Sequence, residues 1–158
     1  MGIILMEVVF ISENESQTAE IAAKLSEITR AGDVWALHGT LGMGKSVFAR
    51  AFIKNLTSAD EVPSPTFTLV QAYSATDFEI YHYDLYRLEK PEDIFELGVE
   101  ETFYEGVCLI EWPDKMGSLA PRNMWHVSIE PDEKGRKITL TTEDENKIRR
   151  LEKWQNEK

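Results

Sequence analysis

A glycine-rich loop that directly follows a short apolar run constrains this fold more than any other sequence feature. The loop, Gly-Thr-Leu-Gly-Met-Gly-Lys-Ser at residues 39–46, matches G-x-x-x-x-G-K-[ST] at every fixed position. The apolar run 34–37 before it predicts a buried strand. Residues 46–56 after it predict a helix whose inner face carries the apolar side chains Val47, Phe48, Ala51 and Phe52. The order of strand, glycine loop and helix favours an α/β fold.

Each fixed position of this loop has a physical role in holding phosphate groups. The glycines let the backbone wrap closely and point its N–H groups inward, and the helix that follows adds the positive end of its dipole. Lys45 supplies a flexible positive charge for the β and γ phosphates. The Ser46 hydroxyl is a hard oxygen ligand that suits Mg²⁺. The loop therefore predicts a nucleotide site with ATP or ADP and Mg²⁺.

Two acidic residues that end apolar stretches are candidates for the metal side of this site. Asp84 follows residues 80–83, and Glu111 follows the fully apolar run 107–110. Ligands bind at the carboxyl ends of parallel strands, so either acid would lie beside the loop, although either would also suit a solvated strand end. His82 faces the same side of its strand as Asp84. Because no third ligand is evident, we do not expect these two residues to bind a transition metal.

The remaining pattern predicts an α/β domain spanning residues 1–158, with a mostly parallel sheet flanked by helices and a C-terminal antiparallel hairpin. Strands are expected at 8–11, 34–37, 66–73, 79–86, 107–110, 125–130 and 136–142, the last two forming a hairpin around 132–135. A first helix is expected through Ile28 and a third over 92–97, with a proline-containing loop at 60–65. The charged tail 143–158 allows a helix that packs Ile148, Leu151 and Trp154.

Composition bounds the cellular setting and the partners. The chain has 158 residues, and its 28 acidic against 17 basic residues give a net charge of −11. Such a surface repels free nucleic acid, so a role in an RNA pathway would begin with a partner protein; the acidity would also serve solubility alone. The lone Cys108, in an apolar run, predicts a buried reduced thiol. The apolar start, residues 1–10, lacks the flanks of a signal peptide and predicts a strand, so we expect a cytoplasmic protein with no membrane span.

Four blocks of the chain read GTLGMGKS at 39–46, SPTFTL at 64–69, HYDLYRL at 82–88 and IEWP at 110–113. Together these blocks resemble the TsaE family, the ATPase subunit of bacterial tRNA threonylcarbamoyladenosine synthesis. Their order and spacing also fit, with weaker agreement at Thr18 and at Gly135-Arg136. Ser46 stands where the family often has threonine, which keeps the hydroxyl, and Met43 replaces a smaller residue. The resemblance extends to about residue 142.

This resemblance implies a P-loop ATPase with a defined set of site residues. The metal would be held by Ser46 and Glu111 with help from Asp84, and Thr66, in a mobile loop at 64–68, would lie near the γ phosphate. The implied catalytic residues are Lys45, Asp84, Glu111 and Thr66. The implied nucleotide-binding residues are Gly39, Thr40, Leu41, Gly42, Met43, Gly44, Lys45, Ser46, Val47, Trp112 and Arg136.

The resemblance also implies partners similar to TsaB and TsaD. The TsaD-like partner would transfer the threonylcarbamoyl group, and the ATPase would reset the complex between turnovers. The chain would meet tRNA only through that complex.

Two other functions share the glycine loop. A small-metabolite kinase would add a lid with arginines that clamp the transferred phosphate, whereas Arg87 is the only arginine between Arg50 and Arg122. A non-catalytic nucleotide-binding module would not need Asp84 and Glu111. A GTPase is less expected, because no Asn-Lys-x-Asp segment is present.

Overall fold

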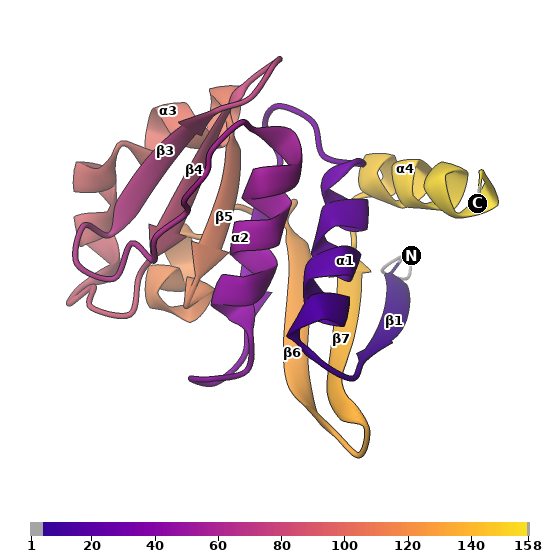
Figure 1. Cartoon of the computed structure of the whole chain (residues 1–158). Coiled ribbons are helices and arrows are strands. Elements are labelled where there is room, and N and C mark those ends of the chain that lie inside the picture. The colour runs from indigo at the N-terminus through magenta and orange to yellow at the C-terminus, as the bar shows by residue number, and fades with distance from the viewer. Residues whose placement is uncertain (1–4, 158) are drawn as a thin grey trace.

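The computed structural model describes residues 5–157, which form a seven-stranded sheet with helices on both faces (Figure 1). The strand order is β1-β7-β6-β2-β5-β4-β3. The central pairs β6–β2, β2–β5 and β5–β4 are parallel, and the outer pairs are antiparallel. The strands are β1 (Met6–Ser12), β2 (Val34–His38), β3 (Val70–Ser74), β4 (Glu79–Asp84), β5 (Val107–Glu111), β6 (Trp125–Asp132) and β7 (Gly135–Thr142). The α/β fold and the β6–β7 hairpin are thus confirmed, and the sheet is mixed.

The helices divide between the two faces of the sheet. In Figure 1, α1 and α2 lie side by side across one face, and a core of apolar side chains joins them to it. A second core lies on the other face under two 3₁₀ segments and one short helix. The helical segments are α1 (Glu15–Ser26), α2 (Lys45–Leu56), η1 (Pro91–Leu97), α3 (Val99–Glu105), η2 (Pro113–Leu119) and α4 (Glu145–Asn156). No helix within residues 5–157 is long and apolar enough to cross a membrane.

Aromatic packing fixes β2 against the helices and β6. The ring of Trp35 stacks on Trp125 with centroids 4.9 Å apart and meets Phe52 of α2 edge-on at 5.1 Å. On the opposite face Cys108 is fully buried, and burial raises the pKa of its thiol to about 12. The prediction of a buried, unreactive cysteine is therefore confirmed.

The inner face of α2 differs from the predicted one. Phe48 and Phe52 are fully buried as expected, but their companions are Ala49 and Ile53, whereas Val47 and Ala51 are half-buried. The buried face of the helix is thus rotated relative to the predicted one, and it includes Lys45 in the first turn. Val47 consequently faces the cavities beside that loop.

The predicted strand at 66–73 was wrong in its first half. Residues 66–69 form a turn closed by the Leu69 amide, which donates to the Pro65 carbonyl at 2.7 Å, and β3 starts only at Val70. Leu69 has a positive φ of 67°, which a strand cannot contain. The apolar alternation of this segment reflects a loop anchored to the sheet edge.

Other boundaries moved by smaller amounts. β4 ends at Asp84, not at 86, and α1 ends at Ser26, so Ile28 packs into the core from beyond the helix. The segment that starts at Pro91 is a 3₁₀ helix, and α3 and η2 were not predicted from the sequence. The expected N-terminal strand is present from Met6, while residues 1–4 lie outside the described part.

The charged tail forms α4, which is tied to the body of the fold by a buried carboxylate. Asp33 is 3% exposed, and Arg150 of α4 donates to both of its oxygens at 2.8 and 2.9 Å. Lys147 lies 3.8 Å from the same carboxylate, and the Trp125 indole donates to it at 3.1 Å. Ile148 and Leu151 of the same helix are also buried, as the sequence predicted.

Candidate functional site

The glycine loop connects β2 to α2 at the carboxyl end of the central parallel strands. Gly44 caps α2 with a φ of 110°, and no side chain occupies the free N–H groups of the first turn. Gly39 has a φ of 150°, and a Cβ there would lie 2.9 Å from the Ile129 carbonyl oxygen. Only glycine suits these two positions, and the result is a backbone nest at a helix N-terminus, which is a built anion site.

Lys45 is folded back over the loop. Its Nζ donates to the Gly39 carbonyl at 2.6 Å and lies 3.5 Å from the centre of the Trp112 ring. Burial lowers the pKa of Lys45, and the nearby carboxylates of Glu111 and Asp84 partly oppose that effect. A phosphate group would offer this ammonium a stronger partner than a carbonyl and an aromatic ring.

The Trp112 backbone is in an unusual conformation. Its φ of 60° and ψ of 52° place a bulky non-glycine residue in the left-handed region, directly after Glu111. The ring packs against Tyr86 at a centroid distance of 5.0 Å. Backbone strain of this kind, about 1–3 kcal/mol, is typical of functional sites because the surroundings must enforce it.

The two acidic residues end adjacent strands. Asp84 of β4 and Glu111 of β5 are register partners, and they are only 6% and 3% exposed. The Ser46 hydroxyl lies 3.5 Å from Oε1 of Glu111, and the other carboxylate oxygen, Oε2, is 2.7 Å from Nε2 of His82. A hydroxyl and a carboxylate oxygen therefore face each other across the start of α2, as hard ligands for Mg²⁺ would.

Asp84 is held on its other side by the proline-containing loop. The Thr66 hydroxyl donates to Oδ2 of Asp84 at 3.2 Å, and the Tyr86 amide donates to Oδ1 at 3.0 Å. Ser64 hydrogen-bonds in turn to Thr66 at 2.8 Å. Phe67, in the same loop, is 86% exposed. The loop thus reaches the acid through a single side chain while most of its surface faces solvent.

Two cavities adjoin at the glycine loop. The larger, of about 280 Å³, is lined by all four expected catalytic residues; its lining is Glu15, Leu41, Gly42, Gly44, Lys45, Ser46, Val47, Ser64, Thr66, Asp84, Glu111 and Trp112. The smaller, of about 180 Å³, lies between α1, the loop and β7; its lining is Ser12, Glu13, Asn14, Glu15, Thr18, Gly42, Met43, Gly44, Val47, Gly135 and Arg136. Both are lined by Glu15, Gly42, Gly44 and Val47, so they form neighbouring compartments.

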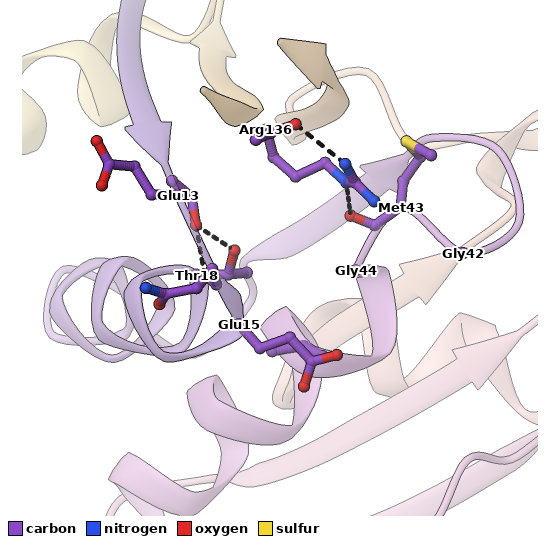
Figure 2. A pocket seen from close by; sticks show the side chains of 11 residues that line it. Glu13, Glu15, Thr18, Gly42, Met43, Gly44 and Arg136 are labelled. Carbon is purple, nitrogen blue, oxygen red and sulfur yellow. Dashed lines mark hydrogen bonds between the residues drawn. The ribbon is translucent and has the colours of Figure 1, made fainter. Parts of the chain in front are cut away.

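Figure 2 shows Arg136 in the wall of the smaller cavity, beside Met43 of the glycine loop. Its Nε donates to the Met43 carbonyl at 3.3 Å, which links β7 to the glycine loop. On the opposite wall Thr18 is buried and hydrogen-bonded to Ser12 at 2.6 Å. The cavity therefore has polar side chains of α1 on one side and Arg136 beside the glycine loop on the other.

Comparison with known proteins decides the family. The family model described as "Threonylcarbamoyl adenosine biosynthesis protein TsaE" matches residues 12–138. The chain belongs to the TsaE family. It is 40% identical over 134 residues to the tRNA threonylcarbamoyladenosine biosynthesis protein TsaE of Rickettsia felis, an alignment that covers 84% of this chain and 78% of the relative. The TsaE of Bacillus subtilis is 35% identical over 130 residues, covering 81% of each.

A solved structure supports the same assignment. The crystal structure of YdiB from Bacillus subtilis superposes with a TM-score of 0.79, covering 99% of this chain and 98% of that one at 26% identity. The resemblance seen in the four sequence blocks is therefore confirmed. This TsaE-family chain has the P-loop NTPase fold and belongs to the biosynthesis of threonylcarbamoyladenosine in tRNA.

The structure brings most of the expected residues of the TsaE site to the two cavities, but Gly39 and Thr40 lie outside both. Lys45, Ser46, Asp84, Glu111 and Thr66 line the larger cavity, whereas Arg136 and Met43 line the smaller one. Gly39 and Thr40 line neither; they border a third cavity of about 250 Å³ with His38 and Trp112.

Some residues at this site were missed by sequence reasoning. Glu13, Asn14 and Glu15 line the smaller cavity, and Asn14 also caps α1 by accepting a hydrogen bond from the Gln17 amide. A polar run before a helix gave no functional signal. His82 was considered only as a metal ligand, yet its partner is Glu111, and within the described residues no three His, Cys, Asp or Glu side chains are grouped to hold a metal ion.

Proposed function

We propose that this chain is a Mg²⁺-dependent ATPase that works in threonylcarbamoyladenosine modification of tRNA, with residues 1–158 acting as one domain. The observation that carries the proposal is the convergence of Lys45, Ser46, Asp84 and Glu111 on one cavity at the glycine loop. A protein that merely held nucleotide would not need two buried carboxylates there, because buried charges are costly unless they have partners. Family membership argues against a small-metabolite kinase.

The two cavities suggest how ATP would lie. The phosphates would fill the larger cavity against the backbone N–H groups of residues 42–46, and the adenosine would enter the smaller one beside Arg136 and Thr18. Val47 would lie beneath the junction between them. Lys45 would leave the Gly39 carbonyl and Trp112 and move to the β and γ phosphates.

The metal would be held between the start of α2 and the end of β5. Ser46 and Glu111 would be its protein ligands, with Asp84 close by. Bound Mg²⁺ would neutralise charge that develops on the β and γ phosphates during hydrolysis.

The remaining groups would position the attacking water. Asp84 keeps hydrogen bonds to the Thr66 hydroxyl and the Tyr86 amide, which fix the direction of its carboxylate. That carboxylate would orient a water toward the γ phosphate. Thr66 would lie near the same phosphate because its hydroxyl is hydrogen-bonded to Asp84. The exposed loop around Thr66 leaves the cavity open to solvent, which weakens electrostatic stabilisation.

We further propose that TsaB- and TsaD-like proteins complete this site. A docked partner would order the loop at residues 64–68 and exclude water, and hydrolysis would reset the complex between turnovers. Such a partner could contact two exposed apolar side chains, Phe67 of this loop and Leu41 of the glycine loop, which is 68% exposed.

A phosphate-release assay tests the proposal directly. ATP is incubated with the protein alone, with the protein and one partner, or with the protein and both partners, in the presence of Mg²⁺ or EDTA. We expect slow Mg²⁺-dependent release by the protein alone and faster release with both partners. Phosphate release at the same rate in Mg²⁺ and in EDTA would overturn the proposed activity. Nucleotide binding without phosphate release under any condition would also overturn it.

A further inference from the structure

We infer that His82 is a positioning residue that fixes the carboxylate of Glu111 so that one oxygen stays turned toward Ser46. This inference rests on the metal role proposed above for Glu111. It concerns a buried histidine that lines neither cavity of the site. His82 therefore acts on the reaction only through the acid it contacts.

The geometry divides the two oxygens of Glu111 between two partners. Nε2 of His82 is 2.7 Å from Oε2, a short hydrogen bond between side chains that are 2% and 4% exposed. Oε1 is the oxygen that lies 3.5 Å from the Ser46 hydroxyl. A glutamate has several rotatable bonds, so a fixed hydrogen bond to one oxygen restricts where the other can lie.

The other ring nitrogen of His82 settles which atom donates. Nδ1 is buried and has no hydrogen-bond partner among the described residues. A buried N–H without an acceptor is costly, whereas a bare ring nitrogen leaves no hydrogen unsatisfied. We therefore assign the hydrogen to Nε2, which donates to Oε2 of Glu111.

Strand alternation explains why position 82 can do this. His82 precedes Asp84 by two residues on β4, so both side chains point to the face that carries α2. Asp84 pairs in register with Glu111, and His82 pairs with Leu109, one pleat further back. From there the imidazole reaches forward beneath the carboxylate, on the side away from the cavity.

The test compares variants that keep or remove the donor. His82→Gln places an amide N–H near the position of Nε2, whereas His82→Asn is too short to reach Glu111 and His82→Leu has no donor. His126→Gln on β6 is the matched control, because the partly buried His126 hydrogen-bonds to His38 and not to Glu111. Glu111→Gln is included to test the metal role itself.

Two readouts separate positioning from general structural support. The first is the Mn²⁺ affinity of the protein with a non-hydrolysable ATP analogue, measured from the loss of the free Mn²⁺ signal in electron paramagnetic resonance. The second is the affinity for a fluorescent ATP analogue in EDTA, where no metal contributes. Loss of a group that holds a metal ligand typically costs about 10- to 100-fold in metal affinity.

We expect His82→Asn and His82→Leu to bind Mn²⁺ about tenfold more weakly or worse, with unchanged nucleotide affinity in EDTA. His82→Gln should stay near wild type. Wild-type Mn²⁺ affinity in His82→Asn would overturn the inference, as would equal losses in the Gln and Asn variants. If Glu111→Gln itself leaves Mn²⁺ affinity intact, the proposed metal role fails, which is a different outcome from failure of His82.

Discussion

Lys45 and Ser46 are consecutive residues at the start of α2 with different partners. Lys45 contacts the Gly39 carbonyl and Trp112, whereas Ser46 faces Glu111. Lys45 would therefore bind the phosphates directly, whereas Ser46 would act on them through the metal. Substitutions at the two positions should weaken nucleotide binding in different ways.

We predict that Lys45→Ala weakens nucleotide binding with or without Mg²⁺, by about 2 kcal/mol or roughly thirtyfold in Kd, because a charged hydrogen-bonding group is lost. Ser46→Ala should bind normally in EDTA and lose affinity only when Mg²⁺ is present. Titration of a fluorescent ATP analogue under both conditions measures this. Lys54→Ala, at the exposed far end of α2, is the control. If both variants bound the nucleotide as tightly as wild type, the assignment of the glycine loop to the nucleotide site would be wrong.

The acids at the ends of β4 and β5 should affect the rate of turnover more than the affinity for nucleotide. We predict that Asp84→Ala and Glu111→Ala each lower the hydrolysis rate by about a hundredfold, or roughly 3 kcal/mol, because they act where charge develops in the transition state. Thr66→Ala should have a smaller effect of the same kind, since it holds Asp84 through one hydrogen bond. Steady-state phosphate release measures all three. Full activity in a variant would exclude that residue from the mechanism.

At the scale of elements, α4 is attached to the sheet by charge as well as by apolar packing. Arg150 donates to both oxygens of Asp33 and to the Ile28 carbonyl, in a region where Asp33 is almost completely buried. Removing one partner of a buried ion pair leaves the other charge uncompensated. This attachment is distant from the glycine loop, so its loss should affect stability alone.

We predict that Arg150→Ala lowers the free energy of unfolding by about 3 kcal/mol, with Arg149→Ala, an exposed neighbour, as the control. Urea unfolding followed by tryptophan fluorescence measures the change. Nucleotide affinity at temperatures where the variant is folded should equal that of wild type. An Arg150→Ala variant as stable as the control would show that Lys147 alone satisfies Asp33.

At the scale of the whole molecule, charge bears on the partners. The chain carries a net charge of −11, and binding to bare nucleic acid rests on neutralising phosphates with basic residues. An acidic surface suits a basic protein or a complex instead. The proposed route to tRNA is therefore through the TsaB- and TsaD-like partners.

We predict no tight binding of tRNA to the isolated protein at physiological salt, measured by filter binding, and retention of tRNA only when the partners are added. The physical reason is the repulsion between like charges, which is screened by salt but not reversed by it. A charge-matched acidic protein without a nucleotide site serves as the control. Tight tRNA binding by the isolated chain would contradict the proposed division of roles.

The local motifs of this protein were readable from its sequence because their physics is local. A glycine loop between an apolar strand and an amphipathic helix specifies a phosphate nest wherever it occurs, and residues 39–46 form one here. The hairpin was equally clear, since β6 and β7 pair in register around a short turn. Two segments that also contribute to the site were predicted wrongly. The alternation at 66–69 suggested a strand, but these residues form a loop whose Thr66 is hydrogen-bonded to Asp84. Val47 was expected on the inner face of α2, but it lines the cavities.

Contacts between residues far apart in the chain depend on how the elements pack together. The hydrogen bond from His82 to Glu111 spans 29 residues, that from Arg136 to Met43 spans 93, and that from Arg150 to Asp33 spans 117. Periodicity says which face of an element a side chain occupies, but not which strands become neighbours in the sheet. Local sequence was enough to specify the phosphate loop with the strand before it and the helix after it. The order of the strands decided the rest, because parallel neighbours β4 and β5 bring His82, Asp84 and Glu111 to one edge.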